Sequence, residues 1–250
     1  MTRFQCVALA AGLLSALVLW LGSWTWLVVI WIIFFLLMGV GVARPQWRYF
    51  GPFICAGNPQ RKQVALTFDD GPDPQSTPRL LEALQQHEIE AAFFAVGRKV
   101  VAAPALANQI LRAGHLLENH SFAHSYATNL FPKRRLTADL EAAQRAIEKH
   151  TGTTPRYFRP PVGLSNPNTF RVAKALRLQV IGWSIRSLDT RQSDPNRIVR
   201  RVVRRLKPGA IILLHDGGIP ADQLVATVKL LLAKLREQGY EVVRLDRMLA

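Results

Sequence analysis

Residues 64–72 read Val-Ala-Leu-Thr-Phe-Asp-Asp-Gly-Pro, an apolar run that ends in two adjacent carboxylates and a Gly-Pro pair. The apolar run predicts a buried β-strand, and Gly71-Pro72 predicts the break that ends it. Neighbouring side chains of a strand point to opposite faces, so Asp69 and Asp70 can serve one site only after the strand has ended. One carboxylate could then ligate a metal ion while the other acts on water. This pattern is typical of a divalent-metal hydrolase.

Short apolar runs alternate with helical patterns along the rest of the chain. The predicted strands are 64–68, 91–96, 115–119, 157–159, 179–183, 210–215 and 241–245. The predicted helices are 77–86, 100–113, 136–150, 168–176, 195–206 and 222–238. Repeated β-α order indicates a parallel sheet, and we expect a distorted (β/α) barrel of about seven parallel strands.

Chemically active residues follow several of these predicted strands. His120 follows the third strand, Arg159 the fourth and residues 183–189 the fifth, while His215 ends the sixth. Functional groups gather at the carboxyl ends of parallel strands in barrels and open α/β sheets. We therefore expect these residues to converge on the Asp69-Asp70 pair.

A second metal signal is the pair His120 and His124. A spacing of four residues predicts two imidazoles on one face of a helical turn. Together with one carboxylate, this mixed nitrogen and oxygen set suits Zn2+, with Co2+, Mn2+, Ni2+ or Fe2+ as alternatives. Three protein ligands leave a position open for water, as in catalytic sites.

Four motifs in this order resemble the NodB-type polysaccharide deacetylases, carbohydrate esterase family four. They are Thr67–Pro72, His120–His124, Arg159–Gly163 and Leu213–His215, and the resemblance covers roughly residues 60–250. It implies a hydrolase that removes an N-acetyl or other N-acyl group from an amino sugar.

The resemblance also implies roles for individual residues. Asp70, His120 and His124 would hold the metal. Asp69 would act as the general base toward the attacking water, and Arg159 would orient Asp69 and keep it ionised.

Further roles concern the leaving group and the walls of the site. His215 would act as the general acid toward the departing amine, and Asp189 would pair with His215. The backbone N–H of Val162 would stabilise the oxyanion. Pro160-Pro161 and Trp183 would contribute to substrate binding.

Three positions depart from the family pattern. Val162 stands where an aromatic residue is common, Thr190 follows Asp189 where tryptophan is usual, and Arg186 replaces a common acidic residue. These changes spare the metal chemistry but reduce stacking surface and add positive charge. We therefore expect the amino sugar to belong to a glycan or to a phosphorylated or lipid-linked saccharide.

Three alternatives to N-deacetylation remain open at this stage. One is O-deacetylation of a glycan, another is a catalytically inactive glycan-binding module tethered to the membrane, and the third is a basic membrane-surface scaffold. The presence of both an expected base and an expected acid argues against the second alternative, whereas the third predicts that Asp69→Asn leaves the phenotype unchanged.

The amino-terminal part of the chain has a different composition. Residues 5–43 contain no charged residue, and as one helix they would span about 58 Å, nearly twice a ~30 Å hydrocarbon core. The segment Gly22-Ser23-Trp24-Thr25 offers a break near the middle. We expect a transmembrane hairpin with helices at 5–21 and 26–43, a linker at 44–62 and a deacetylase domain at 63–250. The run is too long for a signal peptide.

Flanking charges bear on orientation in the membrane. Arg3 precedes the hairpin and Arg44 and Arg48 follow it, whereas the turn is uncharged. The positive-inside rule then favours both ends in the cytoplasm, in a bacterial inner membrane. A single span with the domain outside remains the alternative.

The rest of the chain is basic, with 31 of the 32 Lys and Arg residues and all 17 Asp and Glu residues. No nucleic-acid-binding motif accompanies this charge, so we expect no nucleic-acid partner and instead expect contact with membrane lipids. Cys6 and Cys55 are not expected to form a disulfide.

Overall fold

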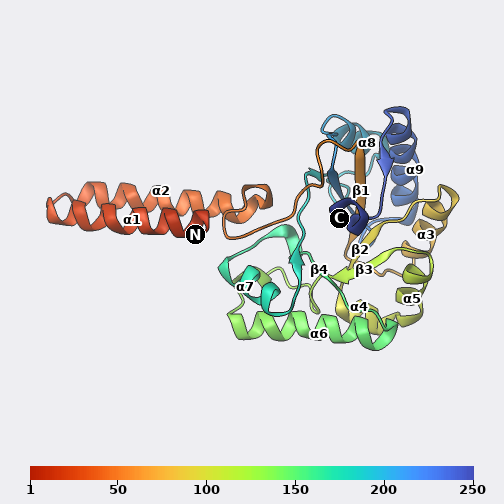
Figure 1. The fold of residues 1–250 in the computed structure, drawn as a ribbon, viewed down its shortest axis with the longest axis horizontal. Coiled ribbons are helices and arrows are strands. Elements are labelled where there is room, and N and C mark those ends of the chain that lie inside the picture. Colours follow the sequence, from red (N-terminus) through yellow and green to blue (C-terminus); the bar gives the residue numbers. More distant parts are fainter.

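Two long apolar helices project from one side of an α/β domain in the computed structural model, which describes residues 1–250 (Figure 1). Helix α1 is Arg3–Trp20 and helix α2 is Trp24–Ala43. Thr2 and Gln5 form a capping box at the start of α1, and Gly22 turns the chain with a φ of 69°. Both helices are long and apolar enough to cross a membrane.

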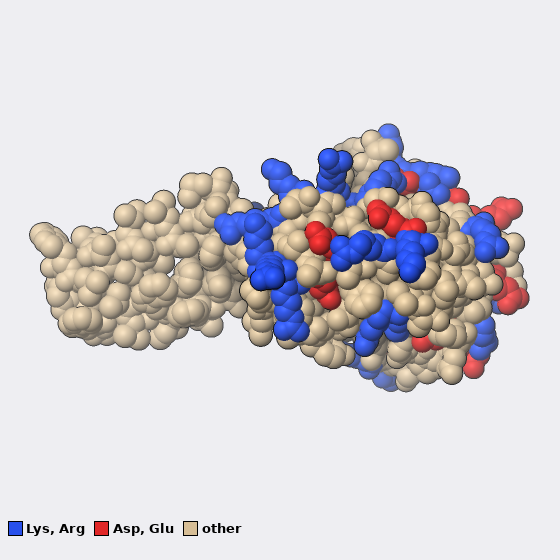
Figure 2. Space-filling model, turned by 90° about the horizontal axis from the view of Figure 1, so that it is seen from below, with Lys and Arg blue, Asp and Glu red and all other residues tan.

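The two helices run side by side as a hairpin whose open end meets the domain (Figure 1). Their apolar side chains are exposed on nearly all sides, and the hairpin surface lacks charge in Figure 2. Basic side chains gather on the domain surface next to it (Figure 2). A helix that is apolar all round requires an apolar environment, either protein or lipid.

The domain is built on a parallel sheet, with strand order β5-β4-β3-β2-β1-β7-β6 and with β8 also paired to β1. The strands are β1 (Gln63–Asp69), β2 (Ala92–Ala95), β3 (Leu116–Asn119), β4 (Tyr157–Phe158), β5 (Gln179–Val180), β6 (Ile185–Arg186), β7 (Ala210–His215) and β8 (Glu241–Val242). This is the distorted (β/α) barrel that the sequence predicted.

A single bent segment, residues 179–186, connects the two ends of this sheet. Its first half, β5, pairs with β4, and its second half, β6, pairs with β7. We predicted one strand over 179–183, but the regular strand ends at Val180, the chain bends at Ser184, and the pairing changes from β4 to β7. The bend closes the barrel and points Trp183 and the residues after it toward the strand ends.

Eight helices belong to the domain. They are α3 (Thr77–Gln86), α4 (Gly97–Ala102), α5 (Pro104–Arg112), α6 (Lys133–Thr151), α7 (Pro167–Ala175), α8 (Pro195–Val203), α9 (Ala221–Glu237) and α10 (Leu245–Leu249). The single helix predicted over 100–113 is wrong, because Pro104 begins a new helix. Helix α10 was not predicted, since residues 241–245 were assigned to one strand.

Residues 44–62 pack against the barrel and are not a free tether. Ile54 forms a β-bridge with Ile181, and Ala56 forms one with Ala210. Phe53 and Cys55, which flank Ile54, are buried. The segment therefore joins the hairpin to the domain through contacts with β-strand residues.

Candidate active site

The carboxyl ends of the strands surround a cavity of about 280 Å³. Its walls include Asp69, Asp70, His120, His124, Trp183 and His215. Asp69 at the end of β1 is the register partner of His215 at the end of β7. Residues predicted from separate motifs thus meet in one place.

Backbone conformation brings the two adjacent carboxylates to this cavity. Strand β1 ends at Asp69, and Asp70 has a φ of 75°, in the left-handed region that few residues other than glycine adopt. The next residue, Gly71, packs so closely on the buried Asp216 that a Cβ atom would overlap its carboxylate. The break predicted at Gly71-Pro72 therefore begins one residue earlier.

A loop, and not a helix, presents the two histidines. The helical turn predicted for residues 120–124 is wrong, because Ser121 and His124 have φ values of 66° and 47°. Asp139 on α6 holds the loop by accepting hydrogen bonds from two of its backbone N–H groups at 3.1 and 3.2 Å. The imidazole ring centroids of His120 and His124 lie 4.9 Å apart.

Asp70, His120 and His124 have the geometry of a set of metal ligands. Oδ1 of Asp70 lies 2.9 Å from Nε2 of His124 and 3.4 Å from Nε2 of His120, and the three ligand atoms lie within 4.8 Å of one another. Two metal–ligand bonds of about 2.0–2.1 Å at a tetrahedral angle separate their ligand atoms by about 3.4 Å. The residues present therefore fit a divalent cation.

Neighbouring groups orient these three residues and shift the pKa values of His120 and Asp70. His120 Nδ1 lies 2.7 Å from the carbonyl oxygen of Arg159, which directs Nε2 toward Asp70. Burial alone would lower the pKa of His120, but Asp69 and Asp70 raise it above its ordinary value. Burial would raise the pKa of Asp70, but His120 and His124 lower it far more.

Asp69 is paired with a fully buried arginine. Nη1 of Arg159 donates to Oδ1 of Asp69 at 2.7 Å and to Oγ1 of Thr67 at 2.9 Å, while Nη2 donates to the carbonyl of Gly182 at 3.0 Å. The guanidinium also lies over the Phe94 ring at 4.1 Å. These contacts fix the position of the carboxylate and compensate its charge in a buried environment.

Asp189 holds His215 at the end of β7. Nδ1 of His215 lies 2.8 Å from Oδ1 of Asp189, and the backbone N–H of His215 donates to Oδ2 at 2.8 Å. Burial alone would lower the pKa of His215, but the Asp189 hydrogen bond and the carboxylates of Asp69, Asp70 and Asp189 raise it overall. Asp189 itself lies behind His215 and does not line the cavity.

The segment after Arg159 forms another wall. Val162 has a φ of 59°, which is strained for a β-branched residue, and lines the cavity beside Trp183. A Cβ atom at Gly163 would overlap the Trp183 ring, so glycine allows that ring its place. Pro160 and Pro161 are buried and do not line the cavity.

Five further residues line the cavity: Tyr126, Arg186, Thr190, Arg191 and Leu213. The sequence had marked Arg186 and Thr190 only as departures from a pattern, and Arg191 carried no signal at all. Tyr126 also contributes to the wall, and its ring lies edge-on to His124 with centroids 6.2 Å apart. The only sequence signal that Tyr126 belongs to the site was its position two residues after His124.

The barrel and this cavity define the class of protein: an α/β-barrel hydrolase with residues able to hold a divalent metal. The polysaccharide deacetylase family profile matches residues 56–181. A Bacillus cereus peptidoglycan-N-acetylglucosamine deacetylase is 39% identical over 190 residues, covering 75% of this chain and 88% of that protein. A Listeria monocytogenes peptidoglycan-N-acetylglucosamine deacetylase is 34% identical over 75% of this chain and only 39% of its own length.

A solved structure also resembles this chain. A pseudoenzyme of carbohydrate esterase family four from Bacillus anthracis superimposes with a TM-score of 0.74 at 30% identity, covering 80% of this chain and 69% of that chain. The chain belongs to the polysaccharide deacetylase family, the NodB-type enzymes of carbohydrate esterase family four, as its four motifs predicted. It is a deacetylase of the hydrolase class.

Proposed function

We propose that this protein is a membrane-inserted, metal-dependent deacetylase that hydrolyses the N-acetyl group of an amino sugar. The observation that carries this proposal is that two further ionisable side chains lie in the same cavity as the three metal-ligating residues. These two side chains have partners of opposite charge. Asp69 pairs with a cation, Arg159, whereas His215 pairs with an anion, Asp189. One arrangement suits a base and the other suits an acid.

Each residue has a defined task in this reaction. Asp69 accepts a proton from the water molecule as the water oxygen bonds to the acyl carbon. Arg159 holds the Asp69 carboxylate in place. The backbone N–H of Val162 stabilises the negative charge that develops on the carbonyl oxygen. His215 donates a proton to the amine nitrogen as the carbon–nitrogen bond breaks, which leaves acetate and a free amino sugar.

Asp70, His120 and His124 would hold the metal. When bound, it would supply Lewis-acid polarisation of the acyl carbonyl. Two imidazoles with one carboxylate suit Zn2+ best among common divalent ions, although Co2+, Mn2+, Ni2+ and Fe2+ accept the same donors.

The substrate that the cavity favours carries negative charge near the acetamido group. Arg186 and Arg191 line the cavity, and neither forms an ion pair with an acidic residue. The Arg186 guanidinium lies 5.9 Å from the Trp183 ring. Uncompensated guanidinium groups recognise phosphate or carboxylate, so a phosphorylated or lipid-linked amino sugar fits better than a neutral oligomer.

Substrate charge can be tested with Arg186→Gln. We expect the variant to lose about tenfold in kcat/KM on a diphosphate-linked N-acetylglucosamine, since one charged hydrogen bond is worth about 1.5–3 kcal/mol. Its kcat/KM on neutral chitotetraose should stay within twofold. Equal losses on both substrates would contradict an anionic specificity.

The base assignment is tested with Asp69→Asn in the full chain. We expect acetate release to fall by about 10²- to 10⁴-fold, because the base is lost, while bound metal measured by elemental analysis is retained. Asp70→Asn should lose the metal as well.

Asp73→Asn is the matched control, because Asp73 lies four residues after Asp69, caps a turn and does not line the cavity. Its activity should equal that of the wild type. Activity of Asp69→Asn within several-fold of wild type would overturn the assignment. Acetate release from O-acetylated but not N-acetylated sugar would support O-deacetylation instead.

A further inference from the structure

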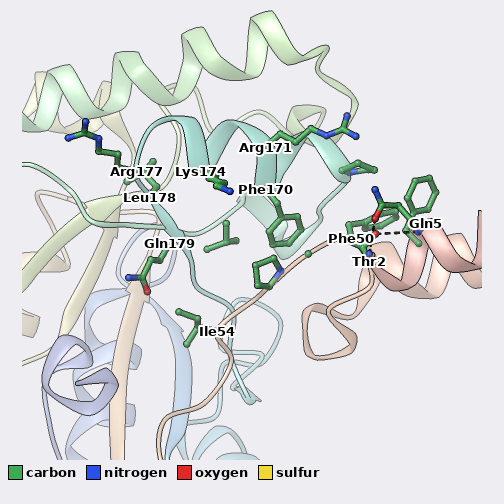
Figure 3. A pocket seen from close by; sticks show the side chains of 15 residues that line it. Thr2, Gln5, Phe50, Ile54, Phe170, Arg171, Lys174, Arg177, Leu178 and Gln179 are labelled. Atoms are coloured by element: carbon green, nitrogen blue, oxygen red, sulfur yellow. Dashed lines mark hydrogen bonds between the residues drawn. The ribbon is translucent and has the colours of Figure 1, made fainter.

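A second cavity, of about 620 Å³, lies where the hairpin meets the domain (Figure 3). Its walls come from the first turn of α1, from residues 50–54 and from α7 with β5. Phe50, Ile54, Phe170 and Leu178 give it an apolar surface. None of these residues lines the deacetylase cavity.

Three cations lie along this pocket and none is neutralised. Arg171 and Lys174 of α7 and the following Arg177 are exposed, and none forms an ion pair. Figure 3 shows Arg177 at the opposite end of the pocket from Phe50 and Thr2, with Lys174 between them. The lining contains no Asp or Glu. The pocket therefore combines an apolar surface with a positive rim.

Contacts between hairpin and domain place this pocket at one end of the hairpin. The backbone N–H of Phe4 donates to the carbonyl of Tyr49 at 3.0 Å, and the Phe4 ring packs on Tyr49 and Phe50. Helix α1 has 18 residues, a length of about 27 Å, which matches a ~30 Å hydrocarbon core. If the hairpin spans the bilayer, the pocket lies at the level of the lipid headgroups.

We infer that this pocket binds the phosphate headgroup of an anionic glycerophospholipid from the surrounding bilayer. The inference rests on the proposed insertion of the hairpin. The phosphate contacts Lys174 near the middle of the pocket, Arg171 and Arg177 add positive charge on either side of it (Figure 3), and the glycerol and upper acyl carbons contact the apolar wall. A soluble phosphate would satisfy the cations but would gain nothing from Phe50, Phe170 or Leu178. The bound lipid thereby fixes the domain against the membrane surface.

The test is lipid titration of the full chain, purified in a neutral detergent, with binding counted by native mass spectrometry. We expect the wild type to bind one phosphatidylglycerol at least tenfold more tightly than phosphatidylcholine. The triple variant Arg171→Gln/Lys174→Gln/Arg177→Gln should lose at least tenfold in phosphatidylglycerol affinity. All three side chains are exposed, so the variant should fold.

A matched control removes three exposed cations from another helix region, Arg197→Gln/Arg200→Gln/Arg204→Gln, and should bind as the wild type does. Equal affinity for the two lipids, equal loss in both triple variants, or displacement of phosphatidylglycerol by millimolar inorganic phosphate would each overturn the inference. Acetate release from the diphosphate-linked N-acetylglucosamine is measured on the same samples. An active enzyme that shows no selective lipid binding would overturn only the lipid site. An inactive enzyme that binds the lipid selectively would overturn only the proposed chemistry.

Discussion

His215 depends on Asp189 for both its position and its charge. The Nδ1 contact at 2.8 Å and the backbone N–H bond at 2.8 Å leave only Nε2 free to face the cavity. The Asp189 carboxylate helps raise the pKa of His215 above its ordinary value despite burial. A raised pKa keeps the imidazole protonated to higher pH, so the acid form needed for proton donation persists into the neutral range.

Asp189→Asn therefore has a directional effect on the pH profile of kcat/KM. Without the carboxylate charge, the pKa of His215 falls, so the alkaline limb should move to lower pH, and kcat should drop by about 10- to 100-fold. The measurement is acetate release between pH 5 and 10. Asp194→Asn, the same substitution at the N-cap of α8, should leave the profile in place. An unmoved alkaline limb in Asp189→Asn would show that His215 is not the titrating acid.

Residue types at the site could be predicted from the sequence, whereas the backbone that presents them could not. Asp70 and His124 were expected as ligands, yet both have left-handed φ values that no pattern of side chains encodes. A four-residue histidine spacing favours a helical turn in isolation. Asp139, which lies on α6 and 15 residues after His124, stabilises the loop instead.

Among the elements, β3 and β4 are joined by a buried carboxylate. Glu118 of β3 accepts hydrogen bonds at 2.8 Å from the backbone N–H groups of Arg156 and Tyr157. Burial nevertheless raises its pKa to about 7. A carboxyl group whose folded pKa exceeds its unfolded value stabilises the fold below the unfolded pKa, and that stability is lost as pH rises through about 7.

Glu118→Gln should consequently flatten the pH dependence of stability. The amide oxygen can still accept both hydrogen bonds, but no proton is released. We expect the variant to match wild type near pH 4.5 and to exceed it at pH 8 by on the order of 2 kcal/mol in free energy of unfolding. Urea unfolding followed by tryptophan fluorescence provides the measurement. Glu82→Gln, on the exposed face of α3, is the control. A variant less stable than wild type at pH 8 would contradict the pKa argument.

The central strands were predictable because β1, β2 and β7 consist mainly of apolar residues between turn residues. The segment 179–186 was harder to predict, because its pairing partner changes from β4 to β7. Pairing depends on residues distant in the chain, so local pattern could not reveal the break between Val180 and Ile185. The same limit explains residues 44–62, whose Pro and Gly content predicted a linker although Ile54 and Ala56 pair with strand residues.

At the scale of the whole molecule, the hairpin and the domain share one junction. Both ends of the hairpin meet the domain, so an inserted hairpin places residue 1 and residue 250 on the same side of the membrane (Figure 1). Arg3, Arg44 and Arg48 flank that junction, and the turn at Gly22 is uncharged. The positive-inside rule then predicts that both termini lie in the cytoplasm.

Topology reporters test this arrangement directly. Green fluorescent protein fused at residue 1 or residue 250 should fluoresce, whereas alkaline phosphatase at either end should be inactive. Alkaline phosphatase fused after Gly22 is the matched control and should be active, because the turn reaches the other side. Opposite sides for the two termini would contradict the hairpin. Both termini outside would keep the hairpin but overturn the charge argument, and the substrate would then be an exported or cell-wall glycan. Both termini inside would restrict the substrate to sugars present in the cytoplasm, in agreement with the phosphorylated or lipid-linked amino sugar proposed above.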